Sequence, residues 1–178
     1  MTYENPSIRR AKMPLTGKIT LMLTLGLMLA AFTANAHADD MVVNAENSLE
    51  WNQKEAFYHA IGNAAALQGK QEIKAESLKA FYDPQTVERT IIRIIADGNA
   101  SFADESHNGS GQKLNYDATS ATYLLNGPGA IISGPDGSGA AEKTIIFKRA
   151  SQIVELVEDA EIKLKDGRHL SGQEIIIY

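Results

Sequence analysis

The sequence predicts an all-β domain in which short antiparallel strands are stacked in repeats of about 30 residues. Three observations lead to this prediction. Small residues recur at a nearly constant spacing, β-branched and aromatic residues are enriched between them, and turns rich in Gly and Asn interrupt these segments every eight to twelve residues. These features alone leave three architectures open, which are a sandwich, a jelly roll and a solenoid.

Residues 1–38 have the features of an export signal and are set apart from the fold. Basic residues precede an apolar run over residues 19–32, and small residues follow at Ala36 and Ala38. The run is short for a membrane span, which needs about 20 apolar residues. We expect a signal peptide over residues 1–38, cleavage after Ala38 and one domain over residues 39–178. The alternative is that the segment is retained as an anchor.

The composition of the remaining chain argues against some classes of protein. Residues 1–38 hold four of the 17 Lys and Arg residues and one of the 22 Asp and Glu residues, so residues 39–178 carry a formal charge of −8. This charge argues against a nucleic-acid-binding protein, which needs a basic face to neutralise phosphates. The chain has no cysteine and therefore no disulfide framework.

Two sets of landmarks define the repeats. The first set lies at spacings of 36, 30 and 30 residues and consists of Ala64, Ala100, Ala130 and Ala160. The second set lies at spacings of 30, 36, 30 and 30 residues and begins at Ala45, Ala75, Gly111, Ala141 and Ser171. Both sets contain the same insertion of six residues, around the stretch 82–90. Their agreement indicates a true structural period.

The repeats determine how each segment is interpreted. Residues 52–82 are rich in Ala, Glu, Lys and Gln, which favour helix, but they are in step with the later repeats and are therefore predicted to form strands. The later strand segments are rich in Ile, Val, Tyr, Phe and Thr and cover residues 90–102, 121–134, 143–157 and 160–178. Turns are predicted at Asp97, His107, Asn126, Ser133 and Lys165, where Gly or Asn supplies a positive φ.

The sequence offers little catalytic chemistry. Its four histidines do not lie at metal-ligand spacings from one another, so we expect no enzyme activity, no catalytic residue, no metal and no cofactor. Asp104, Glu105 and His107 flank a predicted hairpin tip and either form a small polar site or are simply solvated. Lys148 and Arg149 either meet an anionic headgroup or belong to a solvated face.

Several short motifs together resemble a known family. "GNA" occurs at residues 62–64 and 98–100, "AESL" at 75–78, "QKLNYD" at 112–117 and "DGRHLSGQEI" at 166–175. In this order and spacing, the motifs resemble the LptA/OstA-like family of periplasmic lipopolysaccharide-transport proteins. The resemblance covers residues 41–178.

The resemblance implies a fold and a function. It implies a V-shaped β-jelly-roll with an apolar groove that carries the acyl chains of lipid A, with neighbours joined head-to-tail by addition of edge strands. The implied partners are lipopolysaccharide, an inner-membrane LptC-like protein, an outer-membrane LptD-like translocon and further copies of the chain. The implied location of the chain itself is the periplasm. The alternative is an anchored LptC-like protein, or a purely structural β assembly module that does not itself hold lipid.

Apolar residues on both faces of some strands suggest which side chains line a groove, because one face of a sandwich strand is normally wet. We predict a lining by Ile92, Ile94, Phe102, Leu114, Tyr116, Leu124, Ile131, Ile145, Phe147, Leu156, Ile162, Leu164 and Ile175. Each of them could equally be an ordinary core residue. The predicted partner edge strands contain Met41, Val42, Val43, Ile175, Ile176, Ile177 and Tyr178.

Overall fold

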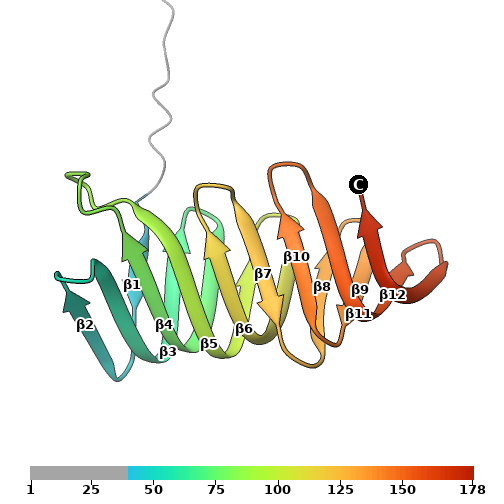
Figure 1. Ribbon diagram of the computed structural model, residues 1–178, viewed down its shortest axis with the longest axis horizontal. Coiled ribbons are helices and arrows are strands. Elements are labelled where there is room, and N and C mark those ends of the chain that lie inside the picture. The colour runs from blue at the N-terminus through green and yellow to red at the C-terminus, as the bar shows by residue number, and fades with distance from the viewer. Residues whose placement is uncertain (1–39) are drawn as a thin grey trace, which may run out of the picture. The chain divides into compact units, whose positions relative to one another are not determined.

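The computed structural model describes residues 40–178, so the predicted signal peptide and its cleavage after Ala38 lie outside the described residues. Within this range the regular secondary structure consists of β-strands, which confirms the all-β prediction (Figure 1). The strands are β1 (Val42–Asn44), β2 (Ser48–Asn52), β3 (Phe57–Gln68), β4 (Gln71–Tyr82), β5 (Ile91–Ala103), β6 (Asn108–Asp117), β7 (Thr122–Asn126), β8 (Ala130–Gly134), β9 (Gly137–Ala141), β10 (Thr144–Lys148), β11 (Ile153–Leu164) and β12 (His169–Ile177).

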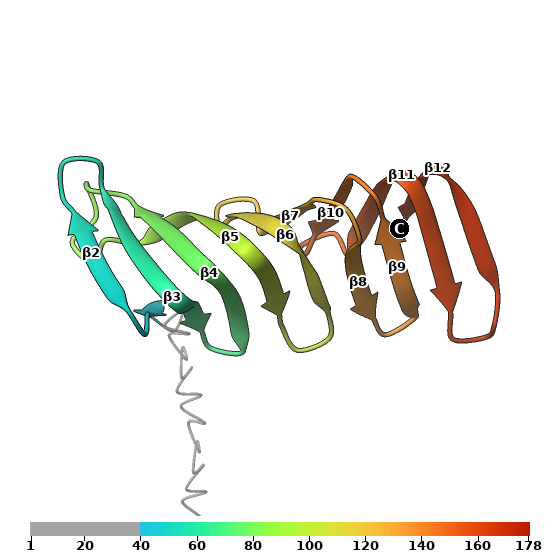
Figure 2. The same cartoon turned by 90° about the horizontal axis from the view of Figure 1, so that it is seen from below.

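The strands pair antiparallel in one sheet, which Figure 1 shows running from β2 at one end to β12 at the other. Beyond β6 the sheet divides. β7 and β10 continue it on one side, β8 and β9 continue it on the other, and both branches meet again at β11. The two branches are separate in Figure 2. The sheet therefore folds over on itself into two layers, as in a jelly roll.

A line of corners separates the two layers. The pairing register shifts between Ile61 and Ala64 in β3 and between Asp97 and Ala100 in β5. At these corners Gly62 has a φ of 84° and Gly98 a φ of 81°, a region that only glycine adopts without a steric cost. β11 has a similar shift between Val157 and Ala160. A bulge of this kind bends the strand, so that one strand serves both layers.

The bends give each layer a defined set of strands. The first layer contains β2, β7, β10 and residues 57–61, 77–82, 91–97, 112–117, 153–157 and 174–177. The second layer contains β1, β8, β9 and residues 64–68, 71–75, 100–103, 108–111, 160–164 and 169–172. Backbone ladders run within each layer.

The corners explain the repeat period. Ala64, Ala100 and Ala160 directly follow a corner, and Ala130 directly follows the turn between β7 and β8, which also crosses from one layer to the other; each of the four has an exposed fraction of 0 %. On the outside of the corners, Asn63 donates to Glu46 at 2.8 Å and Asn99 donates to Glu76 at 2.7 Å. Each corner thus needs a small buried residue and a polar residue that accepts a positive φ. The prediction of a turn at Asp97 is wrong, because residues 97–99 form a corner within the single strand β5 and do not connect two strands.

Residues 52–82 form strands despite their helix-favouring composition. β3 and β4 pair with each other over most of their length, and the small side chains of Ala60, Ala64 and Ala80 are fully buried between the layers. Tertiary packing therefore overrides the helix propensity of alanine. The insertion of six residues appears as the loop between Tyr82 and Ile91, which is ordered by hydrogen bonds from Gln85 and Thr86 to Asp83.

Candidate functional site

The inner face of the first layer carries two continuous rows of apolar and aromatic side chains. The strand register aligns one row along Leu49, Ala60, Leu78, Ala96, Leu114, Leu125, Ile145, Leu156 and Ile175. It aligns the other along Trp51, Tyr58, Ala80, Ile94, Tyr116, Tyr123, Phe147, Val154 and Ile177. The first row lies nearer the corners. Both rows cross the whole layer, from β2 to β12.

The inner face of the second layer uses smaller residues, which leave room for these side chains. Gly109 lies opposite Phe102 in the sheet, and a Cβ atom there would be 2.6 Å from Phe102 Cε1 and 2.8 Å from Leu125 Cδ1. A Cβ atom on Gly139 would be 2.6 Å from Leu156 Cδ2. Large side chains of the first layer therefore pack directly against the backbone of the second.

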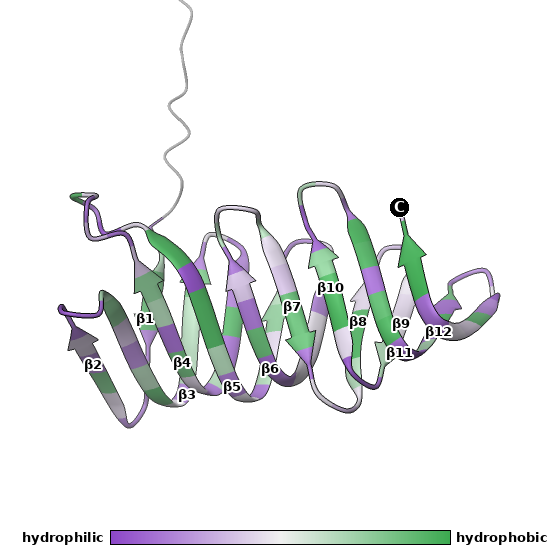
Figure 3. Ribbon diagram, in the orientation of Figure 1, coloured by the Kyte–Doolittle hydropathy of each residue, from purple (hydrophilic) through white to green (hydrophobic). Residues whose placement is uncertain are grey.

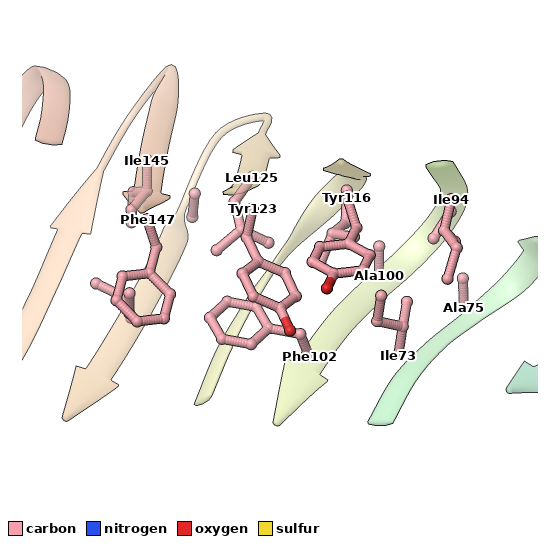
Figure 4. Packing of buried hydrophobic residues seen from close by; sticks show 14 of the residues in the cluster. Ile73, Ala75, Ile94, Ala100, Phe102, Tyr116, Tyr123, Leu125, Ile145 and Phe147 are labelled. Carbon is pink, nitrogen blue, oxygen red and sulfur yellow. The ribbon is translucent and has the colours of Figure 1, made fainter. Parts of the chain in front are cut away.

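An aromatic cluster joins the layers in the middle of the sheet. The ring of Phe102, from the second layer, stacks on Tyr123 of the first at a centroid distance of 4.2 Å and lies 5.9 Å from Phe147 (Figure 4). Tyr116 stacks on Tyr123 at 4.5 Å. These four side chains have exposed fractions of 4 % or less. The middle of the interior is therefore filled by the protein's own side chains.

Polar contacts join the layers along the margin, by which we mean the side of the interior opposite the corners. Gln71 Nε2 in β4 donates to the Tyr123 hydroxyl at 3.1 Å. Arg149 Nε, after β10, lies 3.3 Å from Asp104 Oδ2, after β5, and the Asp104 side chain is only 3 % exposed. Burial raises the pKa of Tyr123 well above its ordinary value of 10.0, and burial also raises the pKa of Tyr116. Both phenols are therefore neutral at physiological pH.

A cavity of about 610 Å³ opens at the end of the interior that is formed by β1 and β2. Its apolar lining includes Met41, Val43, Leu49, Tyr58 and Ile91. The rim includes Arg89 from the loop after β4, whose guanidinium lies 4.7 Å from the ring centroid of Trp51. Trp51 is 43 % exposed, and its indole N–H donates to the Tyr82 hydroxyl at 3.0 Å. The lining also includes Asp40 and Glu88, so this end can accept an apolar group next to a rim that carries charges of both signs.

A second cavity of about 180 Å³ lies at the other end, formed by β8, β9, β11 and β12. Its apolar lining includes Ile132, Val154, Leu156, Ile162, Leu164 and Ile177. Gly134, Gly137 and Gly139 also border it, so backbone as well as side chain is exposed to the space. The interior is thus apolar from end to end, with open volume at both ends.

The predicted lining residues fall into two groups. Ile94, Phe102, Leu114, Tyr116, Ile145, Phe147, Leu156 and Ile162 are buried between the layers, and Leu164 and Ile175 pack against this core at its edge. Ile92, Leu124 and Ile131 lie elsewhere. Ile92 and Ile131 are 42 % and 49 % exposed, and Leu124 is directed outward because its neighbours Tyr123 and Leu125 are directed inward. An inward position is therefore excluded for these three.

Some residues that the structure brings to the interior are missing from the predicted lining. The prediction includes Leu124 rather than Tyr123 and Leu125, since a run of three apolar residues does not show which of its members face inward. The signal that could have identified them is the pairing of residues between neighbouring strands. Tyr116 pairs with Tyr123 and Leu114 with Leu125 across the turn between β6 and β7, so one inward pair implies the other. Gln71 and Arg149 carry no such signal.

The predicted edge segments lie at opposite ends of the sheet. Among residues 40–178, β1 and β2 each pair only with β3, and β12 pairs only with β11. The final part of β12 is strongly apolar (Figure 3), with Ile176 42 % exposed, and Tyr178, which follows the strand, is 89 % exposed. At the other end Val42 is 52 % exposed, whereas Met41 and Val43 pack against the core.

Comparisons with known proteins agree with this architecture. A family model described as the LptA/LptD N-terminal domain LPS transport protein matches residues 42–138. The crystal structure of LptH, the LptA homologous periplasmic component of the lipopolysaccharide transport device from Pseudomonas aeruginosa, superposes with a TM-score of 0.59 at 16 % identity. The match covers 67 % of this chain and 83 % of that one. A comparison with curated protein sequences found no match.

The strand-only architecture is relevant to how the described residues relate to a membrane. Within residues 40–178 there is no helix of the length and apolarity needed to cross a bilayer.

The family model extends over more than half of the chain, and the motifs that resemble the LptA/OstA-like proteins lie on the corners and strands that build the two layers. The chain therefore belongs to the LptA/LptD N-terminal domain family of LPS transport proteins.

Proposed function

We propose that this protein carries lipopolysaccharide from the inner to the outer membrane as part of a periplasmic bridge. The observation that carries the proposal is the apolar interior, which runs from β2 to β12 and has a cavity at each end. Each buried methylene is worth about 0.8 kcal/mol, so a dozen carbons that cross water unprotected face a cost of order 10 kcal/mol. An apolar interior removes most of that cost, and the task requires no catalytic residue.

We propose that the acyl chains contact the inward side chains of both layers. From the predicted lining these are Ile94, Phe102, Leu114, Tyr116, Ile145, Phe147, Leu156, Ile162, Leu164 and Ile175, and we add Leu49, Tyr58 and Ile91 at the larger cavity. This set supports carriage because these side chains stay shielded from water when an acyl chain takes the place of a neighbouring apolar side chain.

We propose that the bridge is assembled by edge-strand addition. Residues 41–43 at one end and residues 175–178 at the other provide backbone groups that can pair with a neighbouring sheet. A contact between unlike ends is heterologous and open, so it can extend into a chain of protomers or end on an LptC-like protein and an LptD-like translocon. The apolar, exposed end of β12 supports this part of the proposal.

Site-specific photo-crosslinking tests lipid carriage. A photoreactive residue at Leu49, which lines the larger cavity and is 55 % exposed, should give an adduct with lipopolysaccharide in cells. Ile61 is the matched control, because it is 40 % exposed on the neighbouring strand but directed to the opposite face. Equal yields at both positions, or no adduct at Leu49, would contradict the proposal.

The second candidate function is an anchored LptC-like protein or a purely structural assembly module. The apolar run at residues 19–32 is the observation that favours an anchor. N-terminal sequencing of the exported protein separates the two cases. We expect the mature chain to begin at Asp39, whereas recovery of residues 1–38 would support the anchored form. A structural module would instead give no lipid adduct at any inward position.

A further inference from the structure

The middle of the interior has no room for an acyl chain in this conformation. The two cavities lie at the ends of the sheet, and between them Phe102, Tyr123 and Phe147 have exposed fractions of 2 % or less and are in mutual contact. Interiors are packed as densely as organic crystals, so a chain cannot pass through such a cluster unless the side chains move apart. Passage from one end to the other therefore requires the layers to separate.

The structure allows the layers to separate without the loss of a backbone ladder in β7 to β10. Backbone ladders run within each layer, and the layers are connected covalently along the corners, so parting the margin breaks no ladder in β7 to β10. As the core opens, the acyl chain takes the place of the apolar side chains that packed against each other. What remains is the set of polar contacts across the margin, because an acyl chain cannot replace them.

Two side-chain contacts hold this margin closed. Gln71 donates to Tyr123 at 3.1 Å, and Arg149 lies 3.3 Å from Asp104. Asp104 is held in place by the backbone N–H groups of Ser106 and His107, at 2.9 and 2.8 Å. Its orientation toward Arg149 is therefore fixed by the turn that carries it.

A third contact strengthens the same place. The His107 ring lies against the Phe147 ring at a centroid distance of 4.5 Å, with Ser106 Oγ 3.0 Å from its Nδ1. The turn between β5 and β6 thus contacts the first layer through both Asp104 and His107. An ion pair of 2.8 Å between Lys70 and Glu105 joins this turn to the neighbouring turn between β3 and β4, which also belongs to the second layer.

We propose that the Gln71–Tyr123 and Asp104–Arg149 contacts form a clasp that must open before an acyl chain can enter the middle of the interior. This inference rests on the proposed function, which supplies the acyl chain, and it adds a gating step with named residues. The layers part about the corners, the clasp contacts break, and Phe102 withdraws from the face that Tyr123 and Phe147 present side by side.

The first test weakens the clasp and measures the rate of acyl uptake. The probe is 11-dansylaminoundecanoate, whose fluorescence rises in an apolar environment, mixed with the protein in a stopped-flow instrument. Contacts of this type each shift an equilibrium roughly two- to tenfold, so the double variant Gln71→Ala, Arg149→Ala should take up the probe about fivefold faster or more. The control is Lys113→Ala, which removes an ion pair of 3.0 Å with Asp97 within the first layer.

The second test locks the clasp. The chain has no cysteine, so Asp104→Cys, Arg149→Cys introduces a single reactive pair that a short bismaleimide can join across the margin. The joined protein should take up the probe at least fivefold more slowly than the same variant left unjoined. The comparison is made within one variant, and a thermal melt of both forms verifies that the protein is folded.

The outcomes separate the two proposals. Faster uptake by the weakened variant together with slower uptake by the joined one supports the clasp. Equal rates in all proteins, with binding intact, overturn the clasp but leave carriage standing, since the chain then enters without parting the layers. Failure of every protein to bind the probe, together with no lipopolysaccharide adduct at Leu49, overturns both.

Discussion

Replacing Phe102 with alanine tests whether the aromatic cluster is what holds the two layers together. The side chain is 2 % exposed and stacks on Tyr123 at 4.2 Å. Truncating a buried phenylalanine to alanine costs about 3–5 kcal/mol, through reduced apolar burial and the cavity left behind, and the stacked geometry places this site in the upper half of the range. We therefore expect the free energy of unfolding to fall by about 4 kcal/mol.

Urea denaturation followed by far-UV circular dichroism measures this loss. With a denaturant slope of about 2 kcal/mol per molar urea, the midpoint should fall by about 2 M. Ile61→Ala on the outer face is the control, and because that side chain is 40 % exposed its midpoint should move by less than about 0.5 M. A loss below about 1 kcal/mol at Phe102 would refute the idea that this cluster joins the layers.

A double-mutant cycle with Gly109 tests the packing itself. A Cβ atom on Gly109 would be 2.6 Å from Phe102 Cε1, so Gly109→Ala alone should cost about 1–3 kcal/mol by overpacking. In the Phe102→Ala background the contact with Phe102 is relieved, while those with Leu125 Cδ1 at 2.8 Å and Ile131 O at 3.0 Å remain, so the two changes should be non-additive by at least about 1 kcal/mol without cancelling the whole cost of Gly109→Ala. Additive costs would show that the two residues are not in contact.

Three further predictions concern other parts of the molecule. Burial raises the pKa of Tyr123 and Tyr116, so the stability that their neutral forms contribute is fully present below their unfolded-state pKa of about 10 and is lost as the pH rises above it. Tyr123→Phe should therefore flatten the decline of the unfolding free energy measured from pH 9 to 12. An unchanged decline would contradict this prediction. Asn99→Ala should cost about 1 kcal/mol in a thermal melt, and Asn99→Gly less, since the φ of 47° favours glycine over alanine; equal costs would count against a conformational role for this corner. Ile176→Lys on β12 should weaken end-to-end association in sedimentation experiments, whereas Leu124→Lys, in the same outer row but in the middle of the sheet, should not.

The sequence predicts the repeats better than it predicts the face on which each side chain lies. The spacing of Ala64, Ala100, Ala130 and Ala160 is informative because every corner needs a small buried residue. A corner and a hairpin turn, however, both use Gly and Asn at positive φ, which is why the sequence of residues 97–99 predicts a turn. The period is visible in the sequence, but its geometric cause is not.

The lining residues show why part of the site lies beyond sequence reasoning. In the run Tyr123 to Leu125 every residue is apolar or amphipathic, and a shift of one residue exchanges the inner and outer faces. Ile92 lies beside a register shift opposite Phe81 and Tyr82, which breaks the alternation that would have placed it. The contacts of Gln71 and Arg149 join residues 52 and 45 positions apart, and no periodic pattern connects such pairs.

The repeat of about 30 residues makes the length of this protein adjustable in whole units. One unit contributes two strands to each layer, and since neighbouring strands lie about 4.8 Å apart, it extends the molecule by about 10 Å without changing its cross-section. Adding or deleting a unit would therefore set the reach of the protein, while every remaining side chain kept its orientation. A single inserted residue within a strand would instead exchange the apolar inner face and the solvated outer face for the rest of that strand.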